Sequence, residues 1–243
     1  MDANRSLAAA LSARIGLTGV VLALLGAGGA ALGVLPPRLG FLLFGPTGLL
    51  LGPVALVLGI VGLARTGPAS GRAGRPQAIR GTALGALLFG VVATLAIPGR
   101  QVPVINDITT NFADPPLFEV AAREIGRPLP YPGESFATQQ RAAYPKVAPI
   151  VILAPPAQAL ERAKSAARGL GLEIVLEDAS AGRLEARATS RIFRFVDDVA
   201  IRVRPTGQGS MIDVRSRSRD GRGDFGVNAK RIEALAEAIR AAR

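Results

Sequence analysis

Three long apolar runs in the first hundred residues constrain this chain more than any other feature. Residues 15–35, 39–63 and 82–97 contain no charged side chain, and they are 21, 25 and 16 residues long. A helix needs about 20 apolar residues to span the hydrocarbon core of a bilayer. The third run is short, but its apolar neighbour Ile79 can extend it. The chain therefore predicts a membrane domain of residues 1–100, with spans at about 15–35, 39–63 and 80–98.

Two other interpretations of these runs are weaker. The third run overlaps in length with buried helices of soluble domains, but it lacks the polar stripe that such helices show. The first run follows Arg5 and Arg14 and resembles a cleaved signal peptide. It is longer than the apolar part of most signal peptides, however, and a second apolar run follows at once. We favour three retained helices.

Arginines around the runs predict the orientation of the chain. The segment 64–81 contains four arginines and no acid: Arg65, Arg72, Arg75 and Arg80. Short loops with such an excess of Lys and Arg stay on the cytoplasmic side. The amino terminus is then cytoplasmic too, and three spans place residues 101–243 outside. We expect a multi-pass protein of the inner (plasma) membrane with a periplasmic carboxyl-terminal part.

Small residues and the absence of ionisable residues indicate how the predicted helices pack and which functions they disfavour. Gly29 with Gly33, and Gly48 with Gly52, fit the small-xxx-small pattern of closely packed membrane helices. We favour packing among the three helices of one chain over dimerisation. The three apolar runs hold no ionisable residue. Because transport and proton-relay sites usually need such groups, this absence disfavours a transporter or a channel.

Composition narrows the classes of function further. The chain has no histidine and no cysteine, so the commonest metal ligand, the usual general base and thiolate nucleophiles are missing. Eight arginines and one aspartate up to Arg100 give +7 of the net charge of +11. Most of the positive charge thus flanks the predicted membrane spans and does not indicate a nucleic-acid binding surface. We expect no catalytic residue, no metal, no cofactor and no nucleic-acid partner.

The rest of the chain predicts an α+β domain. Residues 101–146 hold seven prolines, which forbid long helices and suggest an extended arm that wraps the domain. The periodicity of residues 147–243 predicts strands and helices in the order β-α-β-β-β-β-α. The expected strands are 147–153, 172–177, 183–188, 199–204 and 212–217, and the expected helices are 155–170 and 226–241. One apolar sheet face and two apolar helix stripes predict a two-layer sandwich, an antiparallel sheet with both helices on one face.

The other face of this sheet is then open and charged. It would carry Arg183, Arg187, Arg202, Arg204, Arg215 and Arg217 among Glu173, Glu177, Glu185 and Asp213. Such a face can bind anions such as lipid headgroups or phosphate. It can also be a solvated face whose charges pair across strands. Six arginines against four acids are nearly balanced, which favours the second interpretation.

Several motifs resemble the domain-of-unknown-function 1499 family. They are Pro103–Thr110 with Asp114–Pro116, then Tyr144-Pro145 with Pro149, then Phe193–Val199, then Asp213–Arg219 with Gly223–Ala229 and Arg231-Ile232. Together they cover about residues 103–239, so the resemblance implies that residues 101–243 form the family domain. Bacterial members often pair this domain with hydrophobic helices, and related plastid proteins exist. The resemblance implies no reaction, because the family has no established activity.

Polar residues of these motifs predict a corner where the last strand meets the last helix. Its members are Asn106, Asp107, Arg215, Ser216, Arg219, Asp224 and Asn228. A helix amino terminus with arginines nearby can hold an anion or another ligand. Caps and turns favour the same residue types without any ligand, so we favour a structural joint in which Arg219 or Arg231 pairs with Asp224.

These observations predict a non-catalytic binding or structural role at the cell envelope. The expected partners are the bilayer and an envelope protein, an anionic lipid or a glycan. One alternative is a hydrolase that uses carboxylates or a metal, for which Asp107, Asp197 and Asp198 are the available acids. Adjacent acids in a strand point to opposite faces, so Asp197 and Asp198 are expected in a turn. A small accessory subunit of a membrane complex is a further alternative.

Overall fold

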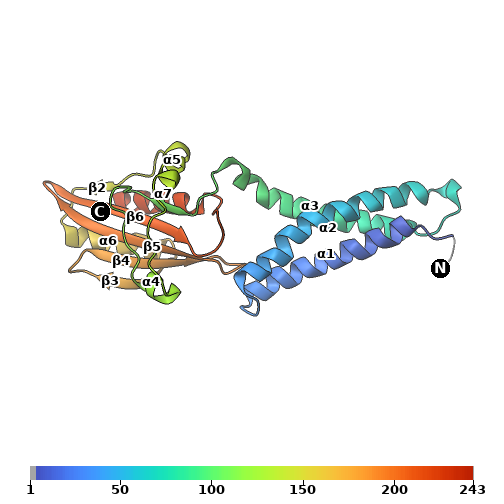
Figure 1. The fold of residues 1–243 in the computed structure, drawn as a ribbon, viewed down its shortest axis with the longest axis horizontal. Helices are drawn as coiled ribbons and strands as arrows, with labels where there is room; N and C mark the ends of the chain where they lie inside the picture. Colours follow the sequence, from blue (N-terminus) through green and yellow to red (C-terminus); the bar gives the residue numbers. More distant parts are fainter. Residues whose placement is uncertain (1–3, 243) are drawn as a thin grey trace. The chain divides into compact units, whose positions relative to one another are not determined.

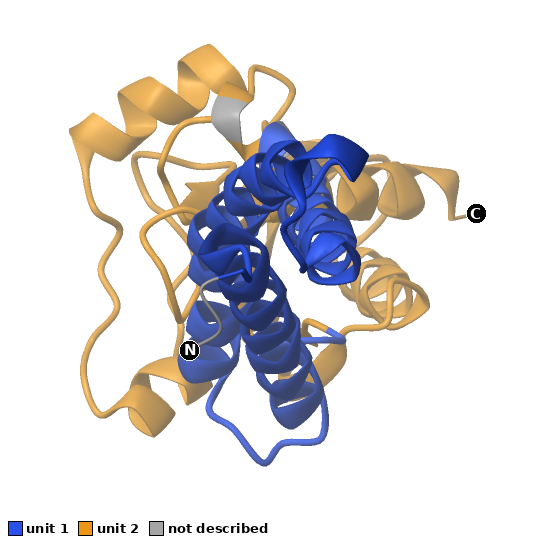
Figure 2. Cartoon of the chain, turned by 90° about the vertical axis from the view of Figure 1, so that its right-hand side faces the viewer, with its two compact units in different colours: residues 1–98, 191–194 blue, residues 99–190, 195–243 orange. Residues whose placement is uncertain are grey.

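The computed structural model describes residues 4–242, which form two compact units (Figures 1 and 2). Unit 1 is the part up to Pro98 together with Arg191–Arg194. Unit 2 consists of Gly99–Ser190 and the part from Phe195 onward.

Unit 1 contains three helices that are long and apolar enough to span a membrane. They are α1 (Leu7–Ala31), α2 (Pro37–Arg65) and α3 (Arg75–Ala96), and a short 3-10 turn, η1 (Pro68–Ser70), lies between α2 and α3. Both α1 and α3 begin before the predicted spans, because the helices continue past Arg14 and Arg80. Ser6 caps α1 by accepting a hydrogen bond from the Ala9 amide.

Small residues line the inside of this three-helix unit, and large apolar ones point outward. Nearly all buried positions of α1 and α2 are Gly, Ala or Ser, whereas Leu24, Leu50 and Leu95 are about two-thirds exposed. Gly48 and Gly52 lie against α3, as the small-xxx-small pattern predicts. The pattern fails for its other pair, because Gly33 lies beyond the end of α1 and is exposed. An apolar exterior over a small-residue interior suits helices surrounded by lipid.

Unit 2 is built on a six-stranded antiparallel sheet with the strand order β1-β6-β5-β4-β3, in which β2 also pairs with β6. The strands are β1 (Asp107–Thr109), β2 (Ile150–Ile152), β3 (Glu173–Asp178), β4 (Arg183–Thr189), β5 (Val196–Thr206) and β6 (Gly209–Ser218). All five predicted strands are present. The sixth, β1, has three residues and is too short to show a period of two.

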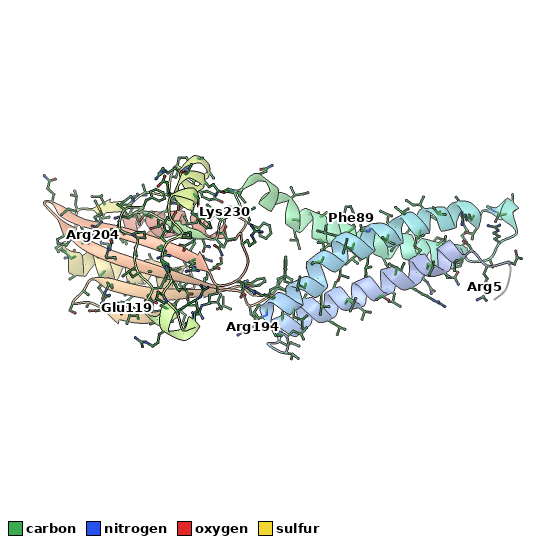
Figure 3. The ribbon with its side chains drawn as sticks, in the orientation of Figure 1. Arg5, Phe89, Glu119, Arg194, Arg204 and Lys230 are labelled. Atoms are coloured by element: carbon green, nitrogen blue, oxygen red, sulfur yellow. The ribbon has the colours of Figure 1, made fainter. Side chains whose placement is uncertain are left out.

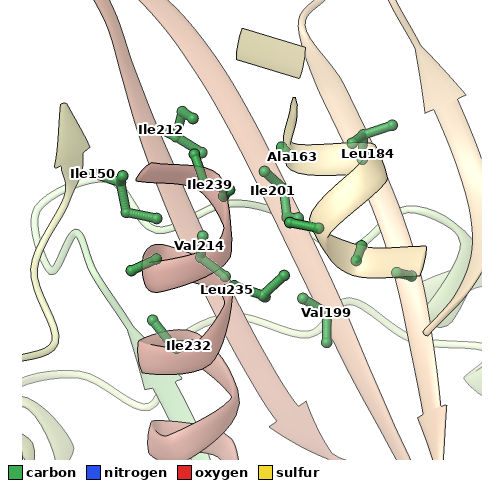
Figure 4. Close-up of a cluster of buried hydrophobic side chains, with 14 of the residues drawn as sticks. Ile150, Ala163, Leu184, Val199, Ile201, Ile212, Val214, Ile232, Leu235 and Ile239 are labelled. Atoms are coloured by element: carbon green, nitrogen blue, oxygen red, sulfur yellow. The ribbon is translucent and has the colours of Figure 1, made fainter. Parts of the chain in front are cut away.

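Two helices cover one face of the sheet, so the predicted α+β class is confirmed. They are α6 (Pro156–Gly169) and α7 (Val227–Ala241). Figure 4 shows Ile232, Leu235 and Ile239 of α7 among sheet residues such as Val199 and Val214. These side chains are almost fully buried. The alternation in β4, β5 and β6 therefore sends the aliphatic residues into one core.

The proline-rich arm differs from the predicted extended segment. Besides β1 it contains α4 (Val120–Ile125) and α5 (Glu134–Ala143), and the 3-10 turn η2 (Ile97–Gln101) precedes it. The prolines delimit these helices instead of forbidding them: α4 lies between Pro116 and Pro128, and α5 between Pro132 and Pro145. A run of six to ten residues without proline is enough for a short helix.

The arm also corrects the prediction of an open charged face. Phe118, Ala121 and Leu129 of the arm pack on Ala200 of β5, on the side of the sheet opposite α6 and α7. Glu185, Asp213 and Arg215 are consequently almost inaccessible to water. The part of the second face that carries these three residues is therefore an interior covered by the arm.

Candidate functional site

Arg215 of β6 is the centre of the interior between the sheet and the arm. Its side chain is fully buried and forms a two-pronged ion pair with Asp107 of β1, with Nε–Oδ1 and Nη2–Oδ2 distances of 2.8 and 2.7 Å. The same guanidinium donates to the carbonyl oxygens of Pro116 and Leu129 in the arm, at 3.2 and 3.0 Å. A single buried cation thus joins the edge strand β1, its neighbour β6 and the arm.

Aromatic rings enclose this cation. The guanidinium carbon lies 4.8 Å from the centre of the Phe118 ring and 5.7 Å from that of Tyr131. Ring faces attract a cation most strongly where water is excluded. Burial and the nearby Asp107 carboxylate raise the pKa of Tyr131 to about 12. The site therefore holds a buried arginine–aspartate pair beside two aromatic rings, one of them a phenol with a raised pKa.

Glu185 of β4 holds the first turn of α4 against the sheet. Its buried carboxylate accepts hydrogen bonds from the backbone amides of Glu119, Val120 and Ala121. The first amides of a helix have no partners within the helix, and a carboxylate there also meets the positive end of the helix dipole. Glu185 thus replaces the missing side-chain cap of α4.

Further ion pairs tie the outer parts of the arm to the sheet. Glu124 of α4 lies 2.6 Å from Arg187 and 2.8 Å from Arg219, and hydrogen bonds from these two arginines lower its pKa. Asp213 binds Arg202 and Arg204 at 3.0 and 2.7 Å. The arginines that suggested an anion-binding face therefore form ion pairs with carboxylates of the chain itself.

The predicted polar corner is divided between the two faces of β6. Asp107, Arg215 and Arg219 lie on the arm side, where Arg219 binds Asp198 of β5 through two 2.7 Å contacts. Ser216 and Asn228 lie on the helix side, with a hydrogen bond of 2.6 Å between them. The sheet separates the two groups, since neighbouring residues of a strand point to opposite faces. The seven predicted residues therefore do not form one site.

The helix-side group is a closed hydrogen-bond network at the start of α7. The Asn228 amide donates to the Asn106 carbonyl and to Ser218 Oγ, and Arg231 donates to Ser216 Oγ and Asn228 Oδ1. Arg231 also binds Asp197 at 2.7 Å. The Asn106 side chain donates to the Gly221 carbonyl. Every member has a partner within the chain, which is the arrangement of a structural joint.

Asp224 has a different role from the predicted pairing with Arg219 or Arg231. Its carboxylate accepts hydrogen bonds of 2.9 and 2.7 Å from the backbone amides of Gly226 and Asn228, so it caps α7. Burial raises the pKa of Asp224, because the ionised carboxylate loses its hydration. The predicted ion pair of Asp224 with Arg219 or Arg231 is therefore wrong.

Gln140 is an important residue that the sequence did not indicate. Its buried amide lies beside β1, where Oε1 accepts from the Thr109 amide at 3.0 Å and Nε2 donates to the Thr109 carbonyl at 2.7 Å. One side chain thus substitutes for a further strand at this edge of the sheet. Its position in a short polar helix gave no signal of that role.

The acids proposed for hydrolysis do not converge. Asp197 and Asp198 belong to β5 and not to a turn, and they point to opposite faces, toward Arg231 and Arg219 respectively. Asp107 is occupied by Arg215. Within residues 4–242, no group of three or more acids is arranged to hold a metal ion.

One hollow of about 550 Å³ lies on the outside of the arm around α4. Apolar residues such as Leu117, Phe118 and Leu129 line it, with Arg123 and Arg127 beside them. Phe118 and Leu129 are buried, whereas Leu117 is 70% exposed. Both arginines are exposed and have no ion-pair partner among residues 4–242. This hollow is the candidate contact site on unit 2.

Comparison with known families gives one match, and it covers most of unit 2. Residues 107–239 match the model of a family described as "Protein of unknown function (DUF1499)". The matched stretch begins at β1 and ends in α7, so it includes the arm, the sheet and both covering helices. Comparison with curated proteins and with solved structures gives no match.

Proposed function

Because the chain belongs to the domain-of-unknown-function 1499 family and begins with three potential membrane-spanning helices, we propose that it is an anchored envelope protein of the inner membrane. In this proposal unit 2 lies in the periplasm and has a non-catalytic binding or structural role. The observation that carries the proposal is the internal pairing of the charges. Asp107, Asp197 and Asp198, the acids available for catalysis, each bind an arginine of the chain.

The distribution of arginines in unit 1 supports the orientation. The start of α1, the end of α2 and the start of α3 lie at one end of the helices, where residues 66–74 connect α2 to α3 and an isolated bridge joins Arg5 to Ala73. That end carries Arg5, Arg65, Arg72 and Arg75, whereas the opposite turn, residues 32–38, carries one arginine, Arg38. An excess of positive charge marks the cytoplasmic end.

Reporter fusions test the orientation directly. Alkaline phosphatase is active only outside the cytoplasm, and green fluorescent protein exported in unfolded form is dark. We expect a fusion after Arg243 to have phosphatase activity and no fluorescence, and fusions in the loop at residue 71 to show the reverse. Fluorescence of the carboxyl-terminal fusion would overturn the periplasmic placement.

The hollow around α4 is the surface that we assign to binding. Its apolar lining suits an aliphatic or aromatic side chain, and its two unpaired arginines suit a carboxylate next to that side chain. We therefore infer an envelope protein with an apolar and acidic segment as the partner. Weak surface pairs contribute little affinity alone, so the buried apolar contact would supply most of it.

Photo-crosslinking in cells tests this assignment. A photoreactive phenylalanine analogue at Leu117, inside the hollow, is expected to give a discrete crosslinked product. The same analogue at Val151, an exposed aliphatic residue of β2 outside the hollow, is the matched control. Reversal of charge by Arg123→Glu and Arg127→Glu is expected to remove the product. A product that survives the reversal, or that forms equally at Val151, would contradict the assignment.

A further inference from the structure

The surface around α4, which belongs to unit 2, carries acids before the helix and arginines at its end. Asp114 and Glu119 precede the helix, and their side chains are 66% and 40% exposed. Figure 3 shows Glu119 beside the short helix that Figure 1 labels α4. Arg123 lies in the last turn and Arg127 follows the helix, and both are exposed. Leu117 protrudes between the two acids. We call these five residues the α4 surface.

Ion pairs with the sheet show that the two ends of the α4 surface are well separated. At the start of the helix, Glu119 pairs with Arg183 of β4. Near its end, Glu124 pairs with Arg187 of the same strand at 2.6 Å. Four residues of a strand span about 13 Å. The α4 surface is therefore acidic at one end and basic at the other.

Charges at both ends can still bind a group from outside. Asp114 lies at the same end as Glu119, because its partner Arg202 faces Arg183 across β5 and β4. Only one carboxylate oxygen, Oδ2, forms that ion pair at 2.9 Å, and the side chain stays largely exposed. At the other end, neither arginine has an ion-pair partner in the described part of the chain. Opposite charges thus remain accessible at the two ends.

We propose that two copies of this chain bind each other through their α4 surfaces, about a two-fold axis. In such a contact each surface meets the same surface of the other copy, with its direction reversed. The acidic end of each copy then faces the basic end of the other. Leu117 of each copy covers the apolar hollow of the other, beside Ala122 and Leu129. The inference rests on the proposed function and names the partner of the hollow.

The composition of the α4 surface favours a second copy as this partner. The occupant of the hollow needs an apolar side chain next to a carboxylate, and the same surface presents this combination in Leu117 between Asp114 and Glu119. A two-fold contact uses each complementary pair twice. In the proposed function both copies are held in one bilayer, which raises their effective concentration, so a small contact is sufficient.

Reversal of charge on each end separately tests the two-fold contact. Two differently tagged copies of the full chain are produced together and purified through one tag. Variant one is Arg123→Glu with Arg127→Glu, and variant two is Asp114→Arg with Glu119→Gln. Each places like charges against each other in a dimer of its own kind, so co-purification should fall at least fivefold. Variants one and two produced together restore opposite charges at both ends and should recover at least half of the original yield.

Removal of the protruding leucine tests the apolar part of the contact without a change of charge. Leu117→Ser should lower co-purification at least threefold, and it keeps the test decisive if a charge variant fails to fold. Leu153→Ser is the matched control, because Leu153 is also an exposed leucine and follows β2, outside the hollow. Equal co-purification of these two variants would overturn the proposal, as would the absence of recovery with folded charge variants.

The photo-crosslink at Leu117 separates this inference from the proposed function. A product with twice the mass of the chain supports both. A product with a different protein, together with co-purification that none of these substitutions changes, overturns the second copy as partner and leaves the hollow as a binding site. The absence of any product at Leu117 contradicts both.

Discussion

Removal of the Arg215 guanidinium tests whether the charged interior holds the arm to the sheet. Arg215→Met keeps an unbranched apolar side chain near Phe118 but deletes the four hydrogen bonds of the guanidinium. The Asp107 carboxylate stays buried, and its nearest remaining cation is Arg217, with Nε 3.7 Å away. A buried charge that loses its partner costs about 3–5 kcal/mol, against a total stability of about 5–15 kcal/mol for a domain.

Tyrosine emission measures this loss in the full chain in detergent. The chain has two tyrosines and no tryptophan, and Tyr131 and Tyr144 both lie in unit 2, so the emission reports this unit alone. With a slope of about 2 kcal/mol per molar urea, a loss of about 4 kcal/mol lowers the unfolding midpoint by about 2 M. Arg141→Met is the control, because it breaks only the exposed pair with Glu134 and the contact of its guanidinium with the Phe112 ring, and it should leave the midpoint nearly unchanged.

A second substitution separates charge from packing. Asp107→Asn removes the uncompensated anion, so the double variant with Arg215→Met should unfold at higher urea than Arg215→Met alone. The reasoning is refuted if Arg215→Met behaves like Arg141→Met. It is also refuted if the double variant loses the sum of the two single losses, because independent effects would show that the two residues do not act as a pair.

Three further predictions concern helix packing, the cap of α4 and alkaline pH. Gly85→Leu should lower the melting temperature of the full chain, because a Cβ there would lie 2.5 Å from a backbone nitrogen of α2, and such overpacking costs about 1–3 kcal/mol. Gly90→Leu on the same helix, with nothing within 4 Å, should not lower it. Glu185→Gln should weaken the cap by about 2 kcal/mol and speed proteolysis within α4 at native conditions; unchanged cleavage would argue against the cap. Burial raises the pKa of both tyrosines, that of Tyr131 to about 12, so absorbance at the phenolate band should stay low through pH 10. Because the folded state keeps phenol protons that the unfolded state releases, stability should fall as pH rises from about 10 to 12, and a Tyr131 midpoint near 10 in Tyr144→Phe would be contrary evidence.

The strands and helices of unit 2 were predictable where the polar and apolar residues keep a regular spacing over enough positions. In β5, Val199, Ile201 and Val203 alternate with polar residues, which identifies both the strand and its core face. The alternation of polar and apolar residues predicts which face of the sheet a side chain points to, but not what covers that face. Arg215 and Arg204 have the same pattern in the sequence, yet one is fully buried and the other is exposed enough to meet water. The difference comes from the arm, which lies about a hundred residues earlier in the chain.

The polar corner was predictable in its residues but not in its arrangement. Proximity in sequence placed Arg215, Ser216 and Arg219 together, whereas the pleat of β6 sends Ser216 to the opposite face from the two arginines. Asp107 is a strong partner only because β1 adds to the edge of the sheet beside β6. A strand of three residues carries too little pattern to be recognised, so this pairing could not be derived from the sequence alone.

The charged interior explains how so short an edge strand can have a single register. A slip of β1 by one residue would turn Asp107 toward the aliphatic core and bring Ile108 to the side of Arg215, since side chains alternate along a strand. Both changes leave a buried charge without a partner, so the Asp107–Arg215 pair penalises the slipped register heavily. The register in turn fixes where the chain enters the sheet, beside the β4–β5 and β6–α7 loops. The buried ion pair therefore fixes the register in which β1 adds to β6.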